Sequence, residues 1–336
     1  MKQNKLNMSE LCASKAFFVA LLFGFAFLVL GCVKPKSVKL FAKTSKETMN
    51  SFPSIARDLN DSCVRRLSYK KKGELFKKII QPGTKLSVLF NRKFSLKMDL
   101  KKCKTANNNT KALLALHATL KTYVQLLEDV ASAKPPAFAS DGLKDILKAA
   151  KLKEKQTEAI SALAGFLYNA AVDGYRNFKL SKAIPSAEKA LPSIFEAVEK
   201  VLGKEEQRVG NQTKKASGYI RLVQNEIASL ANMYRMMVLH IKKSPQTLNE
   251  VDAIQRLHAA YLTQREALRK RIKAAIAYKK AIAAMKEAHS KLNKEVNDLD
   301  AKQVFEAVAD YAKKLYPLVQ EVRKAFDQSE KAGAST

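Results

Sequence analysis

The chain has 336 residues and a formal charge of +30 at pH 7, from 61 lysine and arginine residues against 31 aspartate and glutamate residues. This length is enough for one large hydrophobic core or for two domains. Tryptophan is absent and aromatic residues make up 8% of the chain, so few side chains could stack on nucleic-acid bases. We therefore expect no nucleic-acid partner.

The first predicted element is a short apolar segment, residues 16–30, which holds no charged side chain. Lys2, Lys5 and Lys15 supply a basic start. The segment's 15 residues fall short of the about 20 that a membrane-spanning helix needs. A basic start, a short apolar run and a small residue such as Gly31 are typical of a secretory signal.

The segment ends in Val29-Leu30-Gly31-Cys32 and resembles the lipobox of bacterial lipoproteins, which places a branched apolar residue three positions and a small residue one position before a cysteine. The resemblance covers residues 1–33. It implies that residues 1–31 are a signal peptide that is removed, and that the sulfur of Cys32 carries a diacylglyceryl group with palmitate-like chains. Two acyl chains hold a protein on a membrane where one binds reversibly.

The alternative interpretation is an uncleaved N-terminal membrane anchor in which Cys32 occurs by chance. In both cases the remaining chain is exported and faces outward. By the lipoprotein resemblance, Val33 after Cys32 permits transport to the outer membrane of a Gram-negative cell, facing the periplasm. In other bacteria the protein would lie on the outer face of the plasma membrane.

The other cysteines fit export. Once Cys12 leaves with the signal and Cys32 takes the lipid, Cys63 and Cys103 are the only possible intramolecular pair. An oxidising compartment favours a disulfide between them. Two separate buried thiols remain the alternative. We expect no metal at this pair, because no histidine lies near either cysteine in the sequence.

Residues 32–104 are predicted to form a small basic module beside the membrane. Apolar residues at a spacing of four predict a helix over residues 52–72, and Gln81-Pro82-Gly83 breaks the chain. Apolar residues then alternate with mostly polar ones over residues 86–90 and 94–100, which predicts a β-hairpin. Residues 34–104 hold 20 basic and 5 acidic residues, a net charge of +15.

Basic residues near the end of the predicted helix are candidates for binding an anionic surface, such as phospholipid or lipopolysaccharide headgroups. They are Arg65, Arg66, Lys70, Lys71, Lys72, Lys77 and Lys78. The alternative is that a lysine-rich composition merely keeps an exported protein soluble.

Residues 105–336 are predicted to form an elongated up-and-down helical bundle with coiled-coil-like seams. Apolar residues step by three and four within residues 113–130, 160–170, 220–241 and 304–322, and every seventh residue from 254 to 296 returns to one face of a long helix. Pro135-Pro136 predicts a loop, and Ser140 and Asp141 open a short helix. Pro185 and Pro192 split the next stretch, Gly203 ends it, and Pro317 is expected to bend the last helix. The fold class is therefore mainly α, preceded by the α and β-hairpin module.

Motifs for catalysis or cofactor binding are absent. The histidines His117, His240, His258 and His289 show no HExxH spacing, and no GxSxG, GxxxxGK[ST] or GxGxxG motif occurs. We expect no cofactor and no metal. Arg265, Arg269, Lys273 and Lys280 fall within one arc of a predicted helix and form a second candidate surface for anions. The alternative for this stripe is an ordinary solvated helix face.

These features predict a lipid-anchored cell-envelope protein that acts as a non-enzymatic scaffold or partner-binding bundle. Two alternatives stay open. One is a protein that binds an anionic envelope polymer or lipid headgroups, and the other is an enzyme whose active site has no sequence motif. The expected partners are the membrane, an anionic lipid or lipopolysaccharide, and a protein that binds the bundle.

Overall fold

Helices make up most of the computed structural model, which describes residues 36–79, 99–132, 154–172, 180–209, 212–241, 248–299 and 302–333. The prediction of a mainly helical fold is confirmed. The predicted signal segment and Cys32 lie outside the described residues, as do the short helix expected at Ser140 and most of the predicted β-hairpin. Within the described ranges, no helix is both long and apolar enough to cross a membrane.

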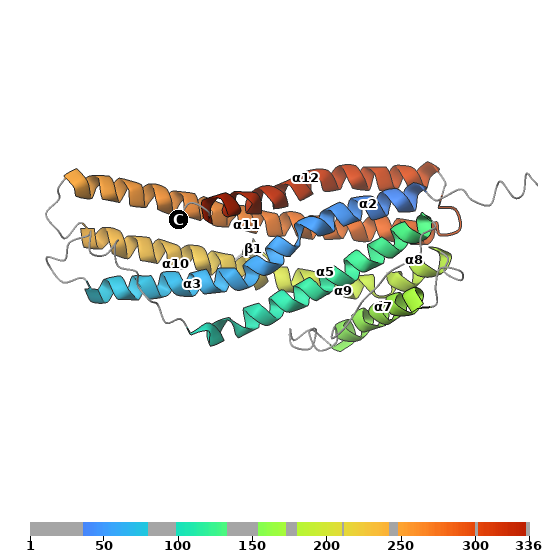
Figure 1. Cartoon of the computed structure of the whole chain (residues 1–336), viewed down its shortest axis with the longest axis horizontal. Helices are drawn as coiled ribbons and strands as arrows, with labels where there is room; N and C mark the ends of the chain where they lie inside the picture. Colours follow the sequence, from blue (N-terminus) through green and yellow to red (C-terminus); the bar gives the residue numbers. More distant parts are fainter. Residues whose placement is uncertain are drawn as a thin grey trace, which may run out of the picture. The chain divides into compact units, whose positions relative to one another are not determined.

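Two helices follow one another at the start of the described chain, α2 (Lys36–Ser51) and α3 (Pro53–Ile79) (Figure 1). Pro53 is the first residue of α3, where its fixed φ suits a helix and its missing N–H is not needed. Helix α3 confirms the predicted helix. Helix α2 is new, because its buried face includes Ser37, Ser45 and Thr48 and so carries a weak apolar pattern.

The predicted hairpin is not supported where it can be compared. Leu100, the last residue of the predicted second strand, begins a 3-10 helix, η2 (Leu100–Cys103). The carboxylate of Asp99 caps this turn by accepting a hydrogen bond of 3.2 Å from the Lys101 backbone N–H. This capping makes a turn more favourable than a continued strand.

The later helices are α5 (Lys104–Ala131), α7 (Glu154–Val172), α8 (Leu180–Glu188), α9 (Leu191–Leu202), α10 (Gly218–Ile241), α11 (Leu248–Lys294) and α12 (Lys302–Gly333). Their buried residues follow the predicted seams, as with Leu113, Leu116 and Leu120 in α5. Pro185 lies inside α8 rather than ending it, and Pro317 lies inside α12.

A short antiparallel pair of strands, β1 (Gln207–Val209) and β2 (Gln212–Lys214), joins α9 to α10. Gly203 ends α9 as predicted, with a φ of 83°. A Cβ there would lie 1.9 Å from the carbonyl oxygen of Ser217, so only glycine fits. The close approach holds the end of α9 against the start of α10.

One hydrophobic core runs through these helices. Helix α11 packs against α10 and α12, α3 packs against α10 and α5, and α2 packs against α12 and α5 (Figure 1). Residues of α2 and α3 belong to the same buried cluster as those of α5 and α9–α12. Lys36–Thr336 is accordingly one compact unit, and the predicted boundary at residue 104 does not separate a membrane-proximal module from the bundle.

Candidate functional site

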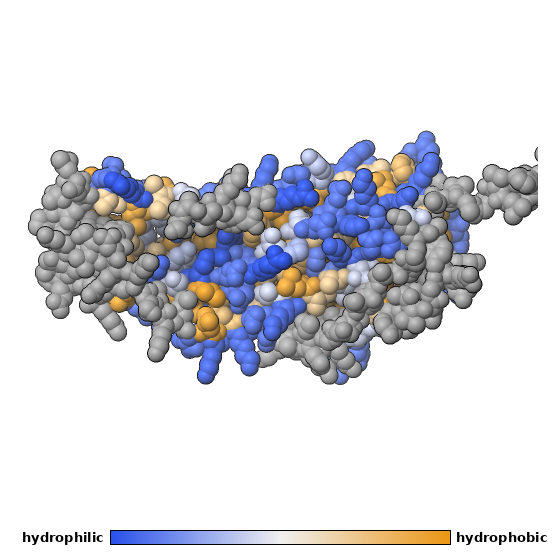
Figure 2. Space-filling view, viewed as in Figure 1, coloured by the Kyte–Doolittle hydropathy of each residue, from blue (hydrophilic) through white to orange (hydrophobic). Residues whose placement is uncertain are grey.

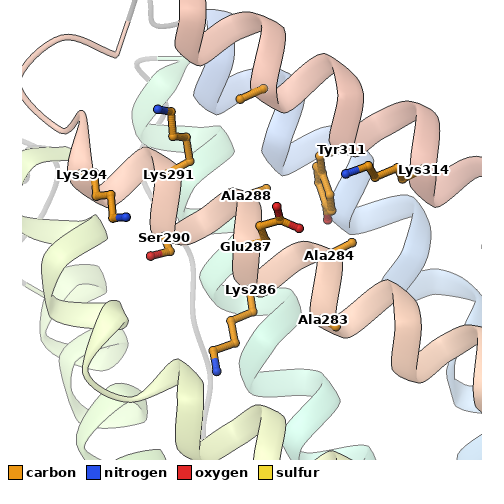
Figure 3. A pocket seen from close by; sticks show the side chains of 11 residues that line it. Ala283, Ala284, Lys286, Glu287, Ala288, Ser290, Lys291, Lys294, Tyr311 and Lys314 are labelled. Carbon is orange, nitrogen blue, oxygen red and sulfur yellow. The ribbon is translucent and has the colours of Figure 1, made fainter.

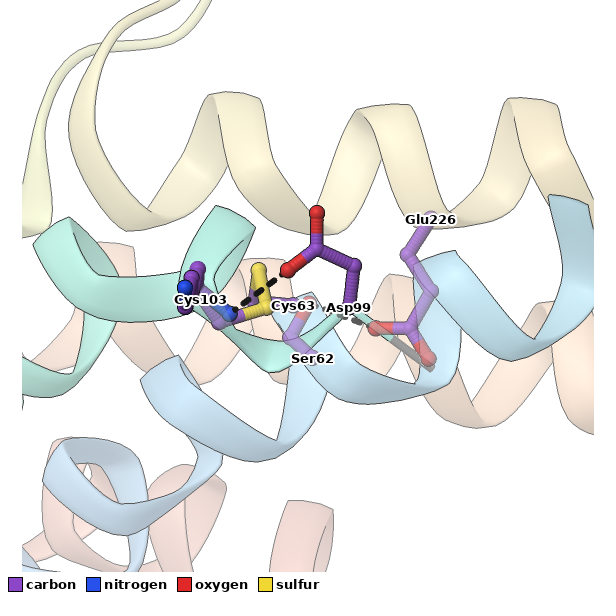
Figure 4. Close-up of a disulfide and its surroundings, with 6 residues drawn as sticks. Ser62, Cys63, Asp99, Cys103 and Glu226 are labelled. Atoms are coloured by element: carbon purple, nitrogen blue, oxygen red, sulfur yellow. Dashed lines mark hydrogen bonds between the residues drawn. A yellow bond between two sulfur atoms is a disulfide. The ribbon is translucent and has the colours of Figure 1, made fainter. Parts of the chain in front are cut away.

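A buried ionic cluster joins α3 to α10. The guanidinium of Arg65 donates hydrogen bonds from Nε to Glu226 Oε1 at 2.6 Å and from Nη2 to Asp58 Oδ1 at 2.8 Å. The hydroxyl of Ser62 donates to Glu226 Oε2 at 2.6 Å (Figure 4). The Glu226 side chain is fully buried, so its charge depends on these partners.

Two further residues complete this ionic cluster from α10 and α11. Arg271 Nη1 donates to Asp58 Oδ1 at 2.8 Å, and the Tyr219 hydroxyl donates to Asp58 Oδ2 at 2.6 Å. Two guanidinium groups therefore balance two carboxylates where α3, α10 and α11 meet. This balance allows the charges to be buried.

The electrostatics of the ionic cluster are those of a structural site. Burial alone would lower the pKa of Arg65, but its hydrogen bond to Glu226 and the charges of Asp58 and Glu226 raise that pKa above its ordinary value. Burial, and then the charge of Asp58, raise the pKa of Tyr219. Arg65 thus pairs with carboxylates inside the protein, whereas the sequence predicts that it binds an anionic surface.

A disulfide between Cys63 and Cys103 lies beside the ionic cluster, and the predicted pairing is confirmed. It joins residues 40 apart in sequence, with their Cα atoms 5.8 Å apart. Figure 4 shows it linking α3 to η2, close to Asp99. The bond fastens η2 and the start of α5 to the middle of α3.

A surface hollow of about 300 Å³ lies next to the disulfide, between α3, η2 and α10. It is lined by Arg66, Leu67, Lys70, Lys71, Glu74, Asp99, Lys102 and Ser229. Four of these side chains are cationic and two are anionic, and Lys102 lies 3.9 Å from Asp99. We call it the basic hollow, and its net positive charge suits an anionic group with several oxygens.

The structure brings together three of the predicted α3 cations, Arg66, Lys70 and Lys71, in the basic hollow. Lys72 and Lys77 are exposed on α3 outside its lining, and the side chain of Lys78 is outside the described set. Lys102 joins them although it lies some 30 residues further along the chain, because the disulfide positions η2. The Cys63–Cys103 pairing was the one sequence signal for that proximity.

The second predicted stripe lies on α11. Arg269, Lys273 and Lys280 are exposed and Arg265 is partly buried. Arg269 lies 4.0 Å from Glu266 in an exposed pair. Such exposed pairs contribute little to stability.

His289 forms the arrangement that most resembles a catalytic group. Its Nε2 lies 2.5 Å from the Tyr123 hydroxyl and its Nδ1 lies 2.7 Å from Glu188 Oε2. This order of hydroxyl, imidazole and carboxylate is that of a nucleophilic triad. Tyr123 and His289 are both about 1% exposed, however, so the Tyr123 hydroxyl is held in the core. The contacts join α5, α8 and α11.

The other histidines have separate surroundings. His117 is buried beside Phe52, with ring centroids 5.0 Å apart. Burial, and then the charge of Lys121, lower its pKa to about 4. His258 is exposed and bonds the Tyr234 hydroxyl at 2.8 Å, and the side chain of His240 lies outside the described set. Among the described residues, no group of three histidine, cysteine or carboxylate side chains could hold a metal ion.

A larger hollow of about 520 Å³ lies along α11 and α12. Its lining includes Lys286, Lys294 and Lys314. Figure 3 shows Lys286 pointing away from Tyr311 and Lys294 lying at the opposite end of the hollow, while Lys314 lies beside Tyr311. The cations do not converge on one point, so this hollow offers a weaker anion site than the basic hollow.

Exposed apolar side chains occur near the end of α10 and the start of α11. Leu239, Val251 and Leu262 are 42%, 41% and 44% exposed. Nearby, the rings of Tyr234 and Tyr261 stack with centroids 4.5 Å apart and join the two helices. Contiguous apolar patches mark surfaces that bind other proteins, whereas single exposed apolar side chains are ordinary.

Comparison of the chain with protein families, with curated proteins and with solved structures finds no match. The case for a function therefore depends on the sequence signal and on the geometry above.

Proposed function

We propose that this chain is a lipid-anchored protein of the bacterial cell envelope whose helical bundle is a non-enzymatic, partner-binding scaffold. The observation that carries the proposal is the short chain between the lipobox and the fold. Helix α2 begins at Lys36, four residues after Cys32. Four extended residues span at most about 14 Å. A diacylated Cys32 would hold the folded unit beside the bilayer.

Two further features support the proposal. The Cys63–Cys103 disulfide suits an oxidising compartment, because disulfides are rare where thiols are kept reduced. The exposed Leu239, Val251 and Leu262 supply an apolar surface for a protein partner. The buried position of the Tyr123 hydroxyl favours a scaffold over an enzyme that would use His289 as a base.

A test of the anchor uses metabolic labelling with a palmitate analogue in bacteria that express the full chain. Wild type and the matched control Cys12→Ala should both incorporate label and lose the signal segment. Cys32→Ala should do neither, because the acylated sulfur is gone. Equal labelling of Cys32→Ala would contradict the proposal.

The basic hollow favours a second function, the binding of an anionic envelope polymer. Arg66 lies 30 residues after Lys36, which corresponds to about 45 Å of helix. The basic hollow and the lipid are therefore well separated along α2 and α3. The two can therefore serve different ligands, and a polymer such as lipopolysaccharide or a cell-wall acid supplies the anionic oxygens that suit the basic hollow.

Binding of inorganic polyphosphate to the purified protein tests this second function. Lys70→Ala combined with Lys102→Ala should weaken binding about thirtyfold, at roughly 1 kcal/mol for each lysine near an anionic surface. Lys155→Ala combined with Lys182→Ala removes the same charge from exposed positions elsewhere and should change binding little. High salt should weaken binding by the wild type. Equal losses for the two double variants would show non-specific attraction and reject the site.

A further inference from the structure

We infer that the surface shared by α2 and α12 is the face that lies against an anionic lipid bilayer, an inference that rests on the proposed lipid anchor. The two helices pack side by side (Figure 1). The Ser37 hydroxyl bonds the Leu299 carbonyl oxygen just before α12, and the Ser45 hydroxyl lies 2.8 Å from the Tyr311 hydroxyl. These contacts make the helices parallel, so the start of α12 lies at the Lys36 end of α2.

Helix α2 supplies the cations of this face. Lys36, Lys39 and Lys43 are exposed, and the exposed part of α2 carries one carboxylate, that of Glu47. The three lysines fall within 11 residues of Cys32 in the sequence. They are therefore closer along the chain to the lipid than the cations of the basic hollow are. Each lysine that reaches an anionic bilayer surface favours binding.

Helix α12, which packs against α2, supplies exposed aromatic rings. Phe305 is 41% exposed and Tyr316 is 67% exposed. They are 11 residues apart, which places them about 20° apart around the helix and about 16 Å apart along it. Both rings therefore lie on one side of α12. Aromatic rings with lysine neighbours are typical of surfaces that rest at a membrane interface.

Two carboxylates near this face form ion pairs with lysines of α12. Glu306 lies 3.7 Å from Lys302, and Asp310 lies 3.5 Å from Lys313. The lysines of α2 thus dominate the charge that an approaching bilayer would meet. Figure 2 shows hydrophilic side chains gathered over α2, with smaller hydrophobic patches over α12 beside them. Lipid at Cys32, lysines on α2 and rings on α12 together fix one orientation on the bilayer.

The test uses the lipidated full chain in vesicles of phosphatidylglycerol and phosphatidylcholine. Phe305→Cys and Tyr316→Cys each introduce a thiol for an environment-sensitive fluorophore, since Cys63 and Cys103 are bonded and Cys32 carries the lipid. Leu262→Cys, at a similarly exposed position on α11, is the matched control. Nitroxide-labelled lipid should quench the fluorophore at 305 and 316 and leave it bright at 262. Quenching absent at 305 and 316, or equal at all three positions, would overturn the inference.

Two further readouts separate the inference from the proposed function. Lys39→Glu combined with Lys43→Glu should reduce quenching at 305 and 316. The control pair, Lys155→Glu combined with Lys182→Glu, should leave quenching unchanged. Equal reduction by both pairs would reject a role of the α2 lysines in membrane contact. Intact mass of the same sample reports acylation. An acylated chain without quenching rejects the orientation alone, and an unacylated chain rejects both.

Discussion

Arg65 of α3 and Glu226 of α10 form a partly buried ion pair, with Nε 2.6 Å from Oε1, although they are 161 residues apart in sequence. Asp58 and Arg271 extend the pair to α11. The carboxylates of Asp58 and Glu226 can be buried because the guanidinium groups of Arg65 and Arg271 pair with them. This ionic cluster therefore specifies how α3, α10 and α11 meet.

We expect Glu226→Gln to lower the free energy of unfolding by about 2 kcal/mol, because it removes one of the two countercharges of Arg65, whose side chain is 30% exposed. Urea denaturation followed by circular dichroism measures the change. Glu306→Gln, in an exposed pair with Lys302, is the matched control and should change stability by less than about 0.5 kcal/mol. Similar values for the two variants would show that the ionic cluster is not an energetic link.

His117 should make stability depend on pH. The unfolded chain binds a proton near the ordinary pKa of 6.5, whereas the buried ring does so only at about 4. The unfolded state thus holds more protons in this window, and the free energy of unfolding should fall by about 3 kcal/mol as the pH drops from 6.5 to 4.

The matching variant is His117→Leu, which fills a similar volume and cannot be protonated. The difference in stability between wild type and His117→Leu should therefore change in favour of the variant as the pH falls through this window. Denaturation series at several pH values measure it. A constant difference would mean that the ring titrates normally in the folded protein.

Tyr123→Phe should cost about 1–2 kcal/mol, because it leaves Nε2 of the buried His289 without its hydroxyl partner. Thermal denaturation checks the loss. Tyr316→Phe removes a hydroxyl from an exposed ring and should be neutral. A neutral Tyr123→Phe would mean that the histidine finds another partner.

The sequence predicts α3 and α5 well, since their apolar residues keep helical spacing without interruption. It misses α2, where serine and threonine occupy half of the buried face, and it misassigns Arg65, whose partner is remote in sequence. A signal for the ion pair was available. Glu226 lies three residues after Val223 and four before Leu230, so a carboxylate stands at a core position of the predicted seam.

The basic hollow was predictable only in part. The α3 lysines were visible as a cluster, but the contribution of Lys102 depends on the disulfide and on the turn at Asp99. The distance along the chain between the basic hollow and the proposed lipid site at Cys32 could not be inferred without α2, because the sequence predicts only a small module over residues 32–104. Helices α2 and α3, which follow one another in the chain, together set the distance between Lys36 and the basic hollow.

The disulfide should stabilise both the fold and the basic hollow. Cys63→Ser combined with Cys103→Ser frees a loop of 40 residues and should cost about 3–4 kcal/mol of unfolding free energy. Polyphosphate binding should weaken too, since η2 is no longer fastened to α3. A reductant should reproduce both losses in wild type and have no effect on the double variant. Unchanged stability after reduction would contradict this role.

The intact mass of the membrane-extracted protein is the most direct test of lipid attachment at Cys32. In wild type and in Cys12→Ala we expect a chain of residues 32–336 that carries a diacylglyceryl group on Cys32. A wild-type chain without acyl mass, or one that begins at a residue other than Cys32, would contradict it.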